Sequence, residues 1–424
     1  MKHVLASACI AVGIGAIVSQ ASAEDTIAIG FNAPLSGPAS GWGLPGITGL
    51  QIYIDKKNAE GGVDVGGTKY ALELVTFDNE LVPSKALQGA RQLVFEHDVK
   101  LIIDLGSTTA DSQHPFLTEQ KVFYASLVSS DISPKRPYVF AGSDYNPRGE
   151  MARVIYQRVM FPEKNRYAIL SQDDVSGLVT QSWEVAAAKA LGFDLVYDKH
   201  YSQETTDFAP IVSAVLATEP DFISLNVTWP DFIVPIVEQL YLQGFKGVLS
   251  ANYFIEEQLT PKVPPEWLET VHTIDSYPLF DDPWWGTPSS QHEFAQAWME
   301  RYGPGAPEDQ HRAMAGVDWL YEPLLEFYVA AVEKAGTLDP DAVLEAMHSM
   351  DQVNTIQGPT GIGGEDMWGQ KNMLSPPVPT TEFRTECNCK RIQMMMRFEP
   401  WYDLHKEKLN AVVRERGHMW DQRH

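Results

Sequence analysis

The chain has 424 residues and a formal net charge of −24, from 56 acidic and 32 basic side chains. So acidic a chain is not expected to bind nucleic acid or an anionic membrane surface. Its length predicts two or more domains, and 44% hydrophobic residues are ordinary for a globular α/β protein.

The first 23 residues have the pattern of a secretory signal peptide. A lysine near the start precedes an apolar run from Val4 to Val18, and Ala21-Ser22-Ala23 supplies a small-residue cleavage site. The run is shorter than the roughly 20 residues that a membrane span requires, so a retained anchor is the weaker alternative. We predict a mature chain that starts at residue 24, reaches the periplasm and is not inserted in the membrane.

Predicted strands and helices alternate from residue 26 to residue 127. Apolar or alternating runs predict strands at residues 26–31, 70–78, 99–106 and 121–127. Apolar residues at helical spacing predict helices at residues 44–62 and 84–98, and Pro45 suits the first turn of the first helix. This alternation with short links indicates a parallel sheet covered by helices.

The same pattern then starts again. Strands are predicted at residues 166–174, 193–201, 221–227 and 246–253, and helices at 178–192, 207–220 and 230–245. A third stretch adds one strand at 270–277 and helices at 290–303, 313–336 and 340–350. It has too few strands for a third domain, so we expect the chain to return and complete the first lobe. The predicted fold class is α/β, with two doubly wound, Rossmann-like lobes.

The stretch from Gly41 to Gly46 matches G-x-G-x-x-G, the fingerprint of a dinucleotide-binding turn. That fingerprint requires glycines directly after the first strand and an acidic residue about 20 positions later. Here ten residues separate Phe31 from Trp42, and Asp78, which closes the second strand, lies more than thirty positions beyond Gly46. We expect no nicotinamide or flavin cofactor, and predict a ligand loop at a helix N-terminus with Trp42 at the mouth of a cleft.

Several motifs together resemble the leucine/isoleucine/valine-binding protein family, the type I periplasmic solute-binding proteins of ABC importers. They are the loop PLSGP at 34–38, the glycines at 46 and 49, the segment NAEGG at 58–62, and longer stretches at 77–94, 101–115 and 356–364. The order of elements agrees with this family over nearly the whole mature chain.

The resemblance implies two lobes joined by three crossing segments, near Gly142, Asp275 and Gln357. The expected division is a signal peptide (1–23), a first lobe (24–142 and 275–356), a second lobe (143–274 and 357–396) and a C-terminal helical extension (397–424). It also implies a cleft that closes on a small-molecule ligand, and a closed form that docks on an ABC-type membrane permease. We expect the binding protein itself to be a monomer.

The resemblance points to ligand-binding residues in the loops that follow the first-lobe strands. Trp42 takes the place of an aromatic side chain that contacts the apolar part of the ligand. Ser107, Thr108 and Thr109 can offer hydroxyls and helix amides to a carboxylate, although one of these hydroxyls can instead cap the helix. Ser126 and Ser129 are available to an α-amino group, but Val128 stands where the family has a threonine.

In the second lobe, the candidate residues are Thr228, Trp229 and Tyr253. Amino-acid binders of this family place a carboxylate near the position of Tyr253, so this tyrosine and Val128 put an α-amino acid ligand in doubt. The aromatic side chains favour a flat or aromatic ligand, and packing in the core is the alternative. His311 is a further candidate, and the neighbouring Arg312 can bind a second carboxylate or form a surface ion pair.

The remaining polar groups do not indicate an enzyme or a metal site. The chain has no G-x-S-x-G, H-E-x-x-H or Walker motif. The adjacent Asp173 and Asp174 are better explained by solvation or by a helix cap. Cys387 and Cys389 are expected to form a disulfide or to remain free thiols, and no nearby ligands complete a metal site.

The sequence therefore predicts an exported solute-binding protein for a small ligand that carries a carboxylate, either an amino acid or an aromatic acid. A ligand-sensing receptor subunit and a binder of amides or urea-like solutes remain alternatives.

Overall fold

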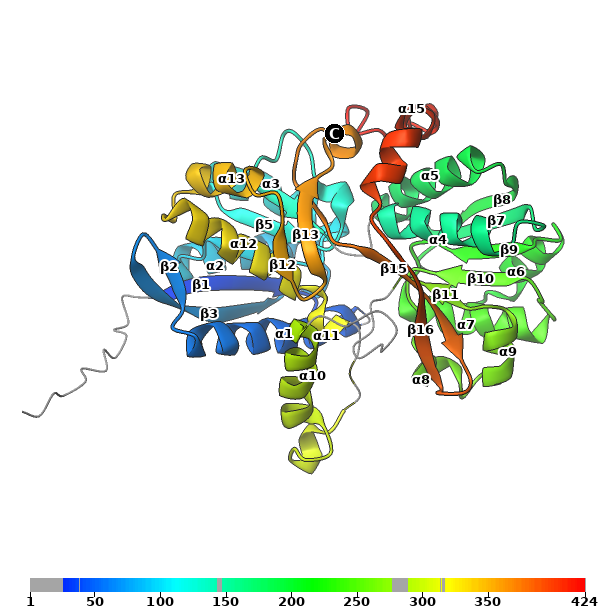
Figure 1. The fold of residues 1–424 in the computed structure, drawn as a ribbon, viewed down its shortest axis with the longest axis horizontal. Coiled ribbons are helices and arrows are strands. Elements are labelled where there is room, and N and C mark those ends of the chain that lie inside the picture. The colour runs from blue at the N-terminus through cyan, green and yellow to red at the C-terminus, as the bar shows by residue number, and fades with distance from the viewer. Residues whose placement is uncertain are drawn as a thin grey trace, which may run out of the picture.

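The computed structural model describes residues 26–37, 39–142, 147–276, 289–312, 314 and 317–423. The predicted signal peptide, residues 1–23, lies outside these residues. Within the described ranges the chain forms two α/β lobes, each built around one sheet (Figure 1). The predicted two-lobed α/β fold is confirmed. No helix in the described part of the chain is both long enough and apolar enough to cross a membrane.

The first lobe contains a mainly parallel sheet with helices on both faces. Side chains of neighbouring positions, such as Ile102 and Ile103, enter different apolar clusters because successive strand residues point to opposite faces. Among the described residues the strand order is β12 (Val353–Thr355), β13 (Gly358–Gly363), β14 (Met373–Ser375), β6 (Val139–Ala141), β5 (Phe123–Ser126), β4 (Leu101–Asp104), β1 (Thr26–Ala33), β3 (Thr68–Asp78) and β2 (Val63–Val65). Its main helices are α1 (Ser40–Ala59), α2 (Pro83–His97), α3 (Ala110–Gln120), α10 (Ser289–Tyr302), α11 (Val317–Leu320), α12 (Glu322–Ala335) and α13 (Pro340–His348).

The second lobe repeats this architecture. Its described strands follow the order β16 (Cys389–Met396), β15 (Val378–Arg384), β11 (Ile274–Asp275), β10 (Val248–Ala251), β9 (Phe222–Leu225), β7 (Arg166–Gln172) and β8 (Asp194–Tyr201). Its helices are α4 (Pro147–Met160), α5 (Val175–Ala190), α6 (Ala209–Leu216), α7 (Pro230–Leu242), α8 (Glu256–Leu259) and α9 (Pro265–Thr270).

The chain changes sheets three times. β6 ends at Ala141 and β11 ends at Asp275, beside the residues where the first two crossings are predicted. The third change occurs between Ser375 and Val378, whereas the sequence places it near Gln357. Gln357 lies instead in the turn between the antiparallel strands β12 and β13, and the chain leaves the first sheet only after β14 has paired with β6.

The glycines of the G-x-G-x-x-G stretch lie inside α1, not in a turn before it. They allow close packing, because a Cβ atom at Gly46 would lie 2.5 Å from the ring of Tyr321. A Cβ atom at Gly49 would lie 1.7 Å from the carbonyl oxygen of Asp318 in α11. Gly46 of this stretch and the nearby Gly49 thus allow contact between α1 and the segment that returns to the first lobe.

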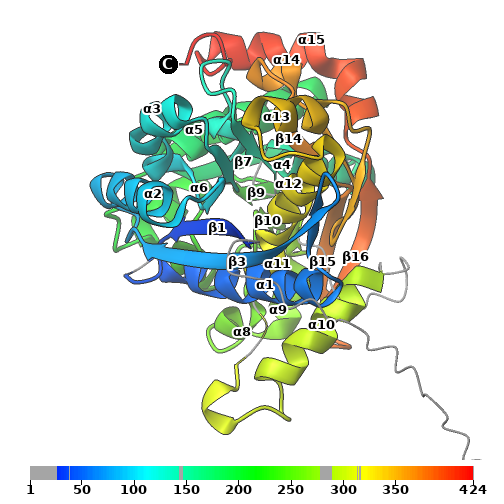
Figure 2. The same ribbon diagram turned by 90° about the vertical axis from the view of Figure 1, so that its left-hand side faces the viewer.

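The C-terminal segment forms a helix, α15 (Glu399–Glu415), that packs along α5 of the second lobe (Figure 1). Tyr402, Leu409 and Val413 are its buried residues. The ammonium group of Lys406 lies 2.9 Å from the carboxylate of Asp366, in the short helix α14 (Glu365–Trp368) between two first-lobe strands. The view in Figure 2 places α15 beside α14. The extension therefore contacts both lobes.

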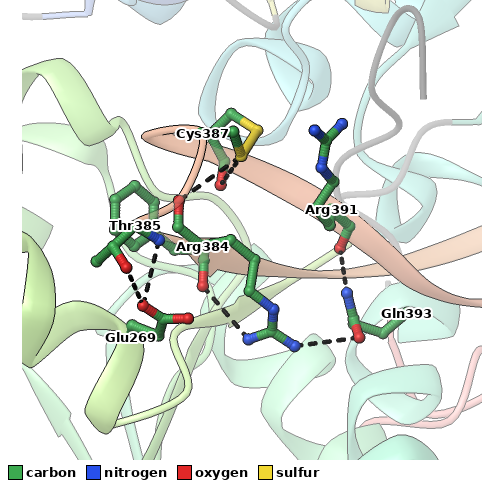
Figure 3. The surroundings of a disulfide bond; sticks show 8 residues. Glu269, Arg384, Thr385, Cys387, Arg391 and Gln393 are labelled. Atoms are coloured by element: carbon green, nitrogen blue, oxygen red, sulfur yellow. Dashed lines mark hydrogen bonds between the residues drawn. A yellow bond between two sulfur atoms is a disulfide. The ribbon is translucent and has the colours of Figure 1, made fainter. Parts of the chain in front are cut away.

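Cys387 and Cys389 form a disulfide at the tip of the β15–β16 hairpin (Figure 3). Beside it, the backbone amide of Thr385 donates a hydrogen bond to the carboxylate of Glu269, and Arg384 donates one to the side chain of Gln393. The structure thus contains the disulfide, which was one of the two alternatives for these cysteines.

Replacement of Gly49 by alanine should destabilise the protein, because the new methyl group would overlap the backbone of α11. We expect a loss of about 1–3 kcal/mol in the free energy of unfolding, measured by denaturant titration. Gly41→Ala is the matched control, since a Cβ atom there meets nothing within 4 Å. It should leave stability unchanged or raise it slightly. Equal effects of the two changes would contradict the packing role.

Candidate ligand-binding site

A cavity of about 50 Å³ lies where the carboxyl ends of the strands of the two lobes meet. This edge is where ligands bind in open α/β sheets, because the loops after parallel strands gather there. The first lobe contributes Trp42, Leu81, Leu105, Gly106, Ser107, Thr108, Leu127 and Val128 to the lining, and the second lobe contributes Gln172, Asp174, Ser176, Val227, Trp229 and Asn252.

The buried carboxylate of Asp131 organises the first-lobe wall. It accepts a hydrogen bond from the backbone amide of Ser107 (3.0 Å) and one from the hydroxyl of Ser126 (2.7 Å). The Ser126 hydroxyl in turn accepts from the amide of Val128 (2.8 Å). Gly106 and Ser107 both have positive φ angles, 95° and 60°. Asp131 therefore ties the strained turn after β4 to the loop after β5.

Burial raises the pKa of Asp131 to about 7, although its hydrogen bonds with Ser126 and Ser107 oppose that shift. A second buried carboxyl, Asp104, accepts from the hydroxyl of Thr109 (2.7 Å) and from the side chain of Gln113 (2.8 Å). These acids use their oxygen atoms to hold loops in place.

The second-lobe wall contains one carboxyl group in the cavity lining, that of Asp174. It caps α5, because one of its oxygens accepts from the amide of Gly177 (2.7 Å). The other oxygen accepts from Gln172 (2.5 Å) and Gln203 (2.9 Å). Burial raises the pKa of Asp174. The cap predicted at Asp173 and Asp174 is confirmed for Asp174.

Two tryptophans, one from each lobe, line the cavity. Trp42 is buried near the start of α1, and its carbonyl oxygen accepts a hydrogen bond of 3.0 Å from the hydroxyl of Tyr321. Trp229 precedes α7 and stacks on Phe232, with ring centroids 5.7 Å apart and an interplanar angle of 7°. The amide of Trp229 donates to the side chain of Gln172 (3.1 Å), which links this ring to Asp174.

Of the ten predicted site residues, four line this cavity, namely Trp42, Ser107, Thr108 and Trp229. Thr109 and Ser126 lie nearby but bind Asp104 and Asp131. Ser129 and Thr228 are buried and do not line the cavity.

Tyr253 and His311 also lie outside the lining. The ammonium group of Lys390 is 4.7 Å from the centre of the Tyr253 ring. His311 is exposed, and its Nε2 atom lies 2.8 Å from the carbonyl oxygen of Ala306. Arg312 forms an ion pair with Asp318, and its guanidinium lies 4.4 Å from the centre of the Tyr302 ring. Arg312 thus forms an ion pair, although its partner carboxylate is buried and does not lie at the surface.

The sequence analysis missed the polar residues Gln172, Ser176 and Asn252 and did not assign Asp174 to the site. Each of the four lies within the last three residues of a predicted strand or just after it, which is the signal that could have found them. Within the described residues, no three side chains of His, Cys, Asp or Glu are grouped so that they could hold a metal ion.

Two α/β lobes joined by crossing segments, with a cavity between them, define the type I periplasmic-binding-protein class. Residues 26–374 match the family model of the periplasmic binding proteins, and the chain belongs to this family. The predicted resemblance to the leucine/isoleucine/valine-binding proteins is confirmed. The chain is therefore a solute-binding protein by family, and the curated relatives that it matches are named Leu/Ile/Val-binding protein homologs.

Three relatives illustrate this similarity. A Leu/Ile/Val-binding protein homolog 7 of Brucella melitensis is 24% identical over 364 residues, which cover 82% of this chain and 86% of the relative. The leucine-binding protein LivK of Thermotoga maritima has a TM-score of 0.69 at 17% identity and covers 88% of this chain and 99% of its own. A solute-binding protein of Rhodopseudomonas palustris HaA2, solved with p-hydroxybenzoic acid, has a TM-score of 0.70 at 19% identity, with 90% and 100% covered.

The pKa of Asp131 leads to a pH-dependent stability. Because burial raises this pKa to about 7, the folded protein holds the proton more tightly than the unfolded chain does. The contribution of Asp131 to the stability of the folded protein is therefore fully present below about pH 4 and is lost as the pH rises to about 7. The asparagine of Asp131→Asn does not titrate, so this variant does not lose that contribution. As the pH rises from 4 to 8, the free energy of unfolding of Asp131→Asn should therefore increase by about 2–4 kcal/mol relative to that of the natural protein.

Chemical denaturation of both proteins at several pH values measures this difference. The exposed loop residue Glu204 provides a control, Glu204→Gln, which should follow the natural protein at every pH. A constant difference between Asp131→Asn and the natural protein would show that Asp131 does not titrate in this range.

Proposed function

We propose that this chain is an exported binding protein that captures a small aromatic carboxylic acid bearing a hydroxyl group and delivers it to an ABC importer. One observation carries the proposal. The described lining of the cavity joins aromatic and aliphatic walls to a single carboxyl group, that of Asp174, and includes no lysine, arginine or histidine.

The ligand carboxylate would bind to the first-lobe wall. The 3₁₀ turn Ser107–Thr109 continues directly into α3, and Thr108 faces the cavity. The first amides of a helix carry partial positive charge and attract anions. Because the Ser107 amide already donates to Asp131, the carboxylate would take its hydrogen bonds from the donors that follow Ser107.

The ring of the ligand would lie between the two lobes. Trp42 and Trp229 supply flat apolar faces, and Leu81, Val128 and Val227 supply aliphatic surface. Contact with both lobes would couple binding to closure, since a ligand shifts a conformational equilibrium only by binding one state more tightly. A flat ring buries more of its surface between two tryptophans than a branched aliphatic side chain does.

The hydroxyl group would reach the second-lobe wall. The Asp174 carboxyl and the Gln172 amide lie together there, and a carboxylate is a strong acceptor for a hydroxyl donor. The p-hydroxybenzoic acid bound by the R. palustris relative supports this ligand class. An amino acid is the second candidate, because Asp174 is also a suitable partner for an ammonium group.

The proposal also covers the cellular setting. We expect a signal peptide cleaved after Ala23, a periplasmic location, a monomer in solution and an ABC-type permease as the protein partner. Uptake of the ligand by membrane vesicles that contain the permease would separate this role from that of a ligand-sensing receptor subunit.

The first test is a thermal-shift screen of the ligand-stripped mature protein. A hundredfold excess of a true ligand over its dissociation constant stabilises the folded state by about 2.7 kcal/mol. We expect 4-hydroxybenzoate and 3,4-dihydroxybenzoate to raise the melting temperature more than benzoate does. A shift with leucine, isoleucine or valine and with none of the aromatic acids would reject this ligand class.

A variant then tests the role of Asp174. Asp174→Asn keeps a residue that caps helices well, so the fold should persist. It should reduce the preference for 4-hydroxybenzoate over benzoate by about tenfold, because the hydroxyl loses a charged acceptor. Asp173→Asn, at the exposed neighbouring position, is the matched control and should leave the preference unchanged. Titration calorimetry gives both affinities.

A further inference from the structure

A second cavity, of about 340 Å³, adjoins the candidate ligand site. The two cavities share Ser107, and Val175 of the second cavity lies between Asp174 and Ser176 of the first. The second cavity is bounded by the loop after β5, by the start of α5 and by the tail that follows α15. Its polar lining residues are Ser107, Asp111, Ser130, Asp131, Ser133, Arg136, His418, Gln422 and Arg423.

Contacts with both lobes hold the tail in place. On the second lobe, Arg416 pairs with Asp198 at 2.6 Å. On the first lobe, Trp420 packs against Gly369, where a Cβ atom would lie 2.6 Å from the indole. Arg423 donates a hydrogen bond of 2.9 Å to the carbonyl oxygen of Ser130, and its guanidinium lies 4.9 Å from the centre of a Trp368 ring. The tail therefore brings Arg423 to this cavity in a fixed position.

Most charged groups around the cavity have partners. Arg136 lies 2.5 Å from the carboxylate of Asp111 and also donates to the carbonyl oxygen of Asp131. The Asp131 carboxylate is bound to Ser107 and Ser126. Burial, together with nearby arginines, lowers the pKa of His418, so this side chain is neutral at pH 7.

Arg423 differs from these groups. It pairs with no carboxylate among the described residues, and its buried Nε atom has no hydrogen-bond partner. Burial lowers the pKa of Arg423 to about 10, although the nearby carboxyls of Asp131 and Asp111 act in the opposite direction. The hydroxyls of Ser107 and Ser130 also have no partner among the described residues. A partly buried cation that forms no direct ion pair is costly, and an anion hydrogen-bonded to it would reduce that cost.

We propose that the second cavity is an anion chamber of the ligand site, in which Arg423 binds a carboxylate. This proposal rests on the proposed function, because the chamber opens beside the aromatic-acid site at Ser107. The planar guanidinium suits a carboxylate, and the two serine hydroxyls supply further donors. The carboxylate is either a second acidic group of the aromatic ligand or a separate small acid.

The test compares three acids on three proteins by calorimetry at pH 7. Benzoate has one carboxylate, terephthalate has a second one across the ring, and acetate stands for a separate small acid. The proteins are the natural chain, Arg423→Gln and the control Arg414→Gln. Arg414 is a tail-proximal arginine that pairs with the exposed Asp421 at 2.9 Å and does not line the chamber.

We expect Arg423→Gln to weaken terephthalate binding at least about tenfold and benzoate binding less than about twofold, with no effect of Arg414→Gln. Binding of acetate that is lost in Arg423→Gln would also support the chamber and would identify a separate acid as its occupant.

Three results would overturn the proposal. Equal weakening of benzoate and terephthalate would show that Arg423 only holds the tail, and an unchanged affinity for every acid would show that it binds no anion. If benzoate and terephthalate each bind Arg423→Gln as tightly as they bind the natural protein, the proposed anion chamber is wrong and the proposed function stands. If no aromatic acid and no acetate bind the natural protein, both fail.

Discussion

The parallel direction of the strands is the constraint on which the site depends. The parallel strands of both sheets end at the cavity between the lobes, so the loop after each strand reaches that cavity. These strands are β4 and β5 in the first lobe and β7, β9 and β10 in the second. A loop at such an edge carries backbone groups without a sheet partner, so it needs side chains to satisfy them. In the first lobe Asp131 accepts a hydrogen bond from the amide of Ser107, in the turn after β4. In the second lobe Asp174 accepts one from the amide of Gly177, in the first turn of α5.

The buried carboxyl groups therefore hold the loops of the candidate ligand site in place and also determine the charge around it. The chain is strongly acidic as a whole, and the acids near the cavity are held by amides and hydroxyls instead of lysine or arginine. Such a wall binds a ligand anion only through oriented dipoles, which are effective in a cavity that excludes water. The single arginine brought in by the tail, Arg423, adds a full positive charge at the edge of this environment.

Sequence reasoning succeeded where local pattern decides the outcome. The alternating elements, the helix cap at Asp174 and the absence of a dinucleotide turn at Gly41 to Gly46 follow from spacing. It could not tell which hydroxyls face the ligand, because a serine such as Ser126 binds whichever partner the fold brings near. The third crossing was misplaced for a related reason, since the pairing of β14 with β6 joins segments that lie far apart in the sequence.

That same pairing delays completion of the first lobe as the chain is made. Met373 lies beside Ala141, and the strands from β7 to β11 of the second sheet fall between them in the sequence. A chain that emerges from its N-terminus cannot cover the edge of β6 until strands β7 to β11 of the second lobe have been synthesised. Contacts this distant form slowly, and an open strand edge can pair with another chain. A chain cut short before Met373 would therefore keep a permanent site for aggregation.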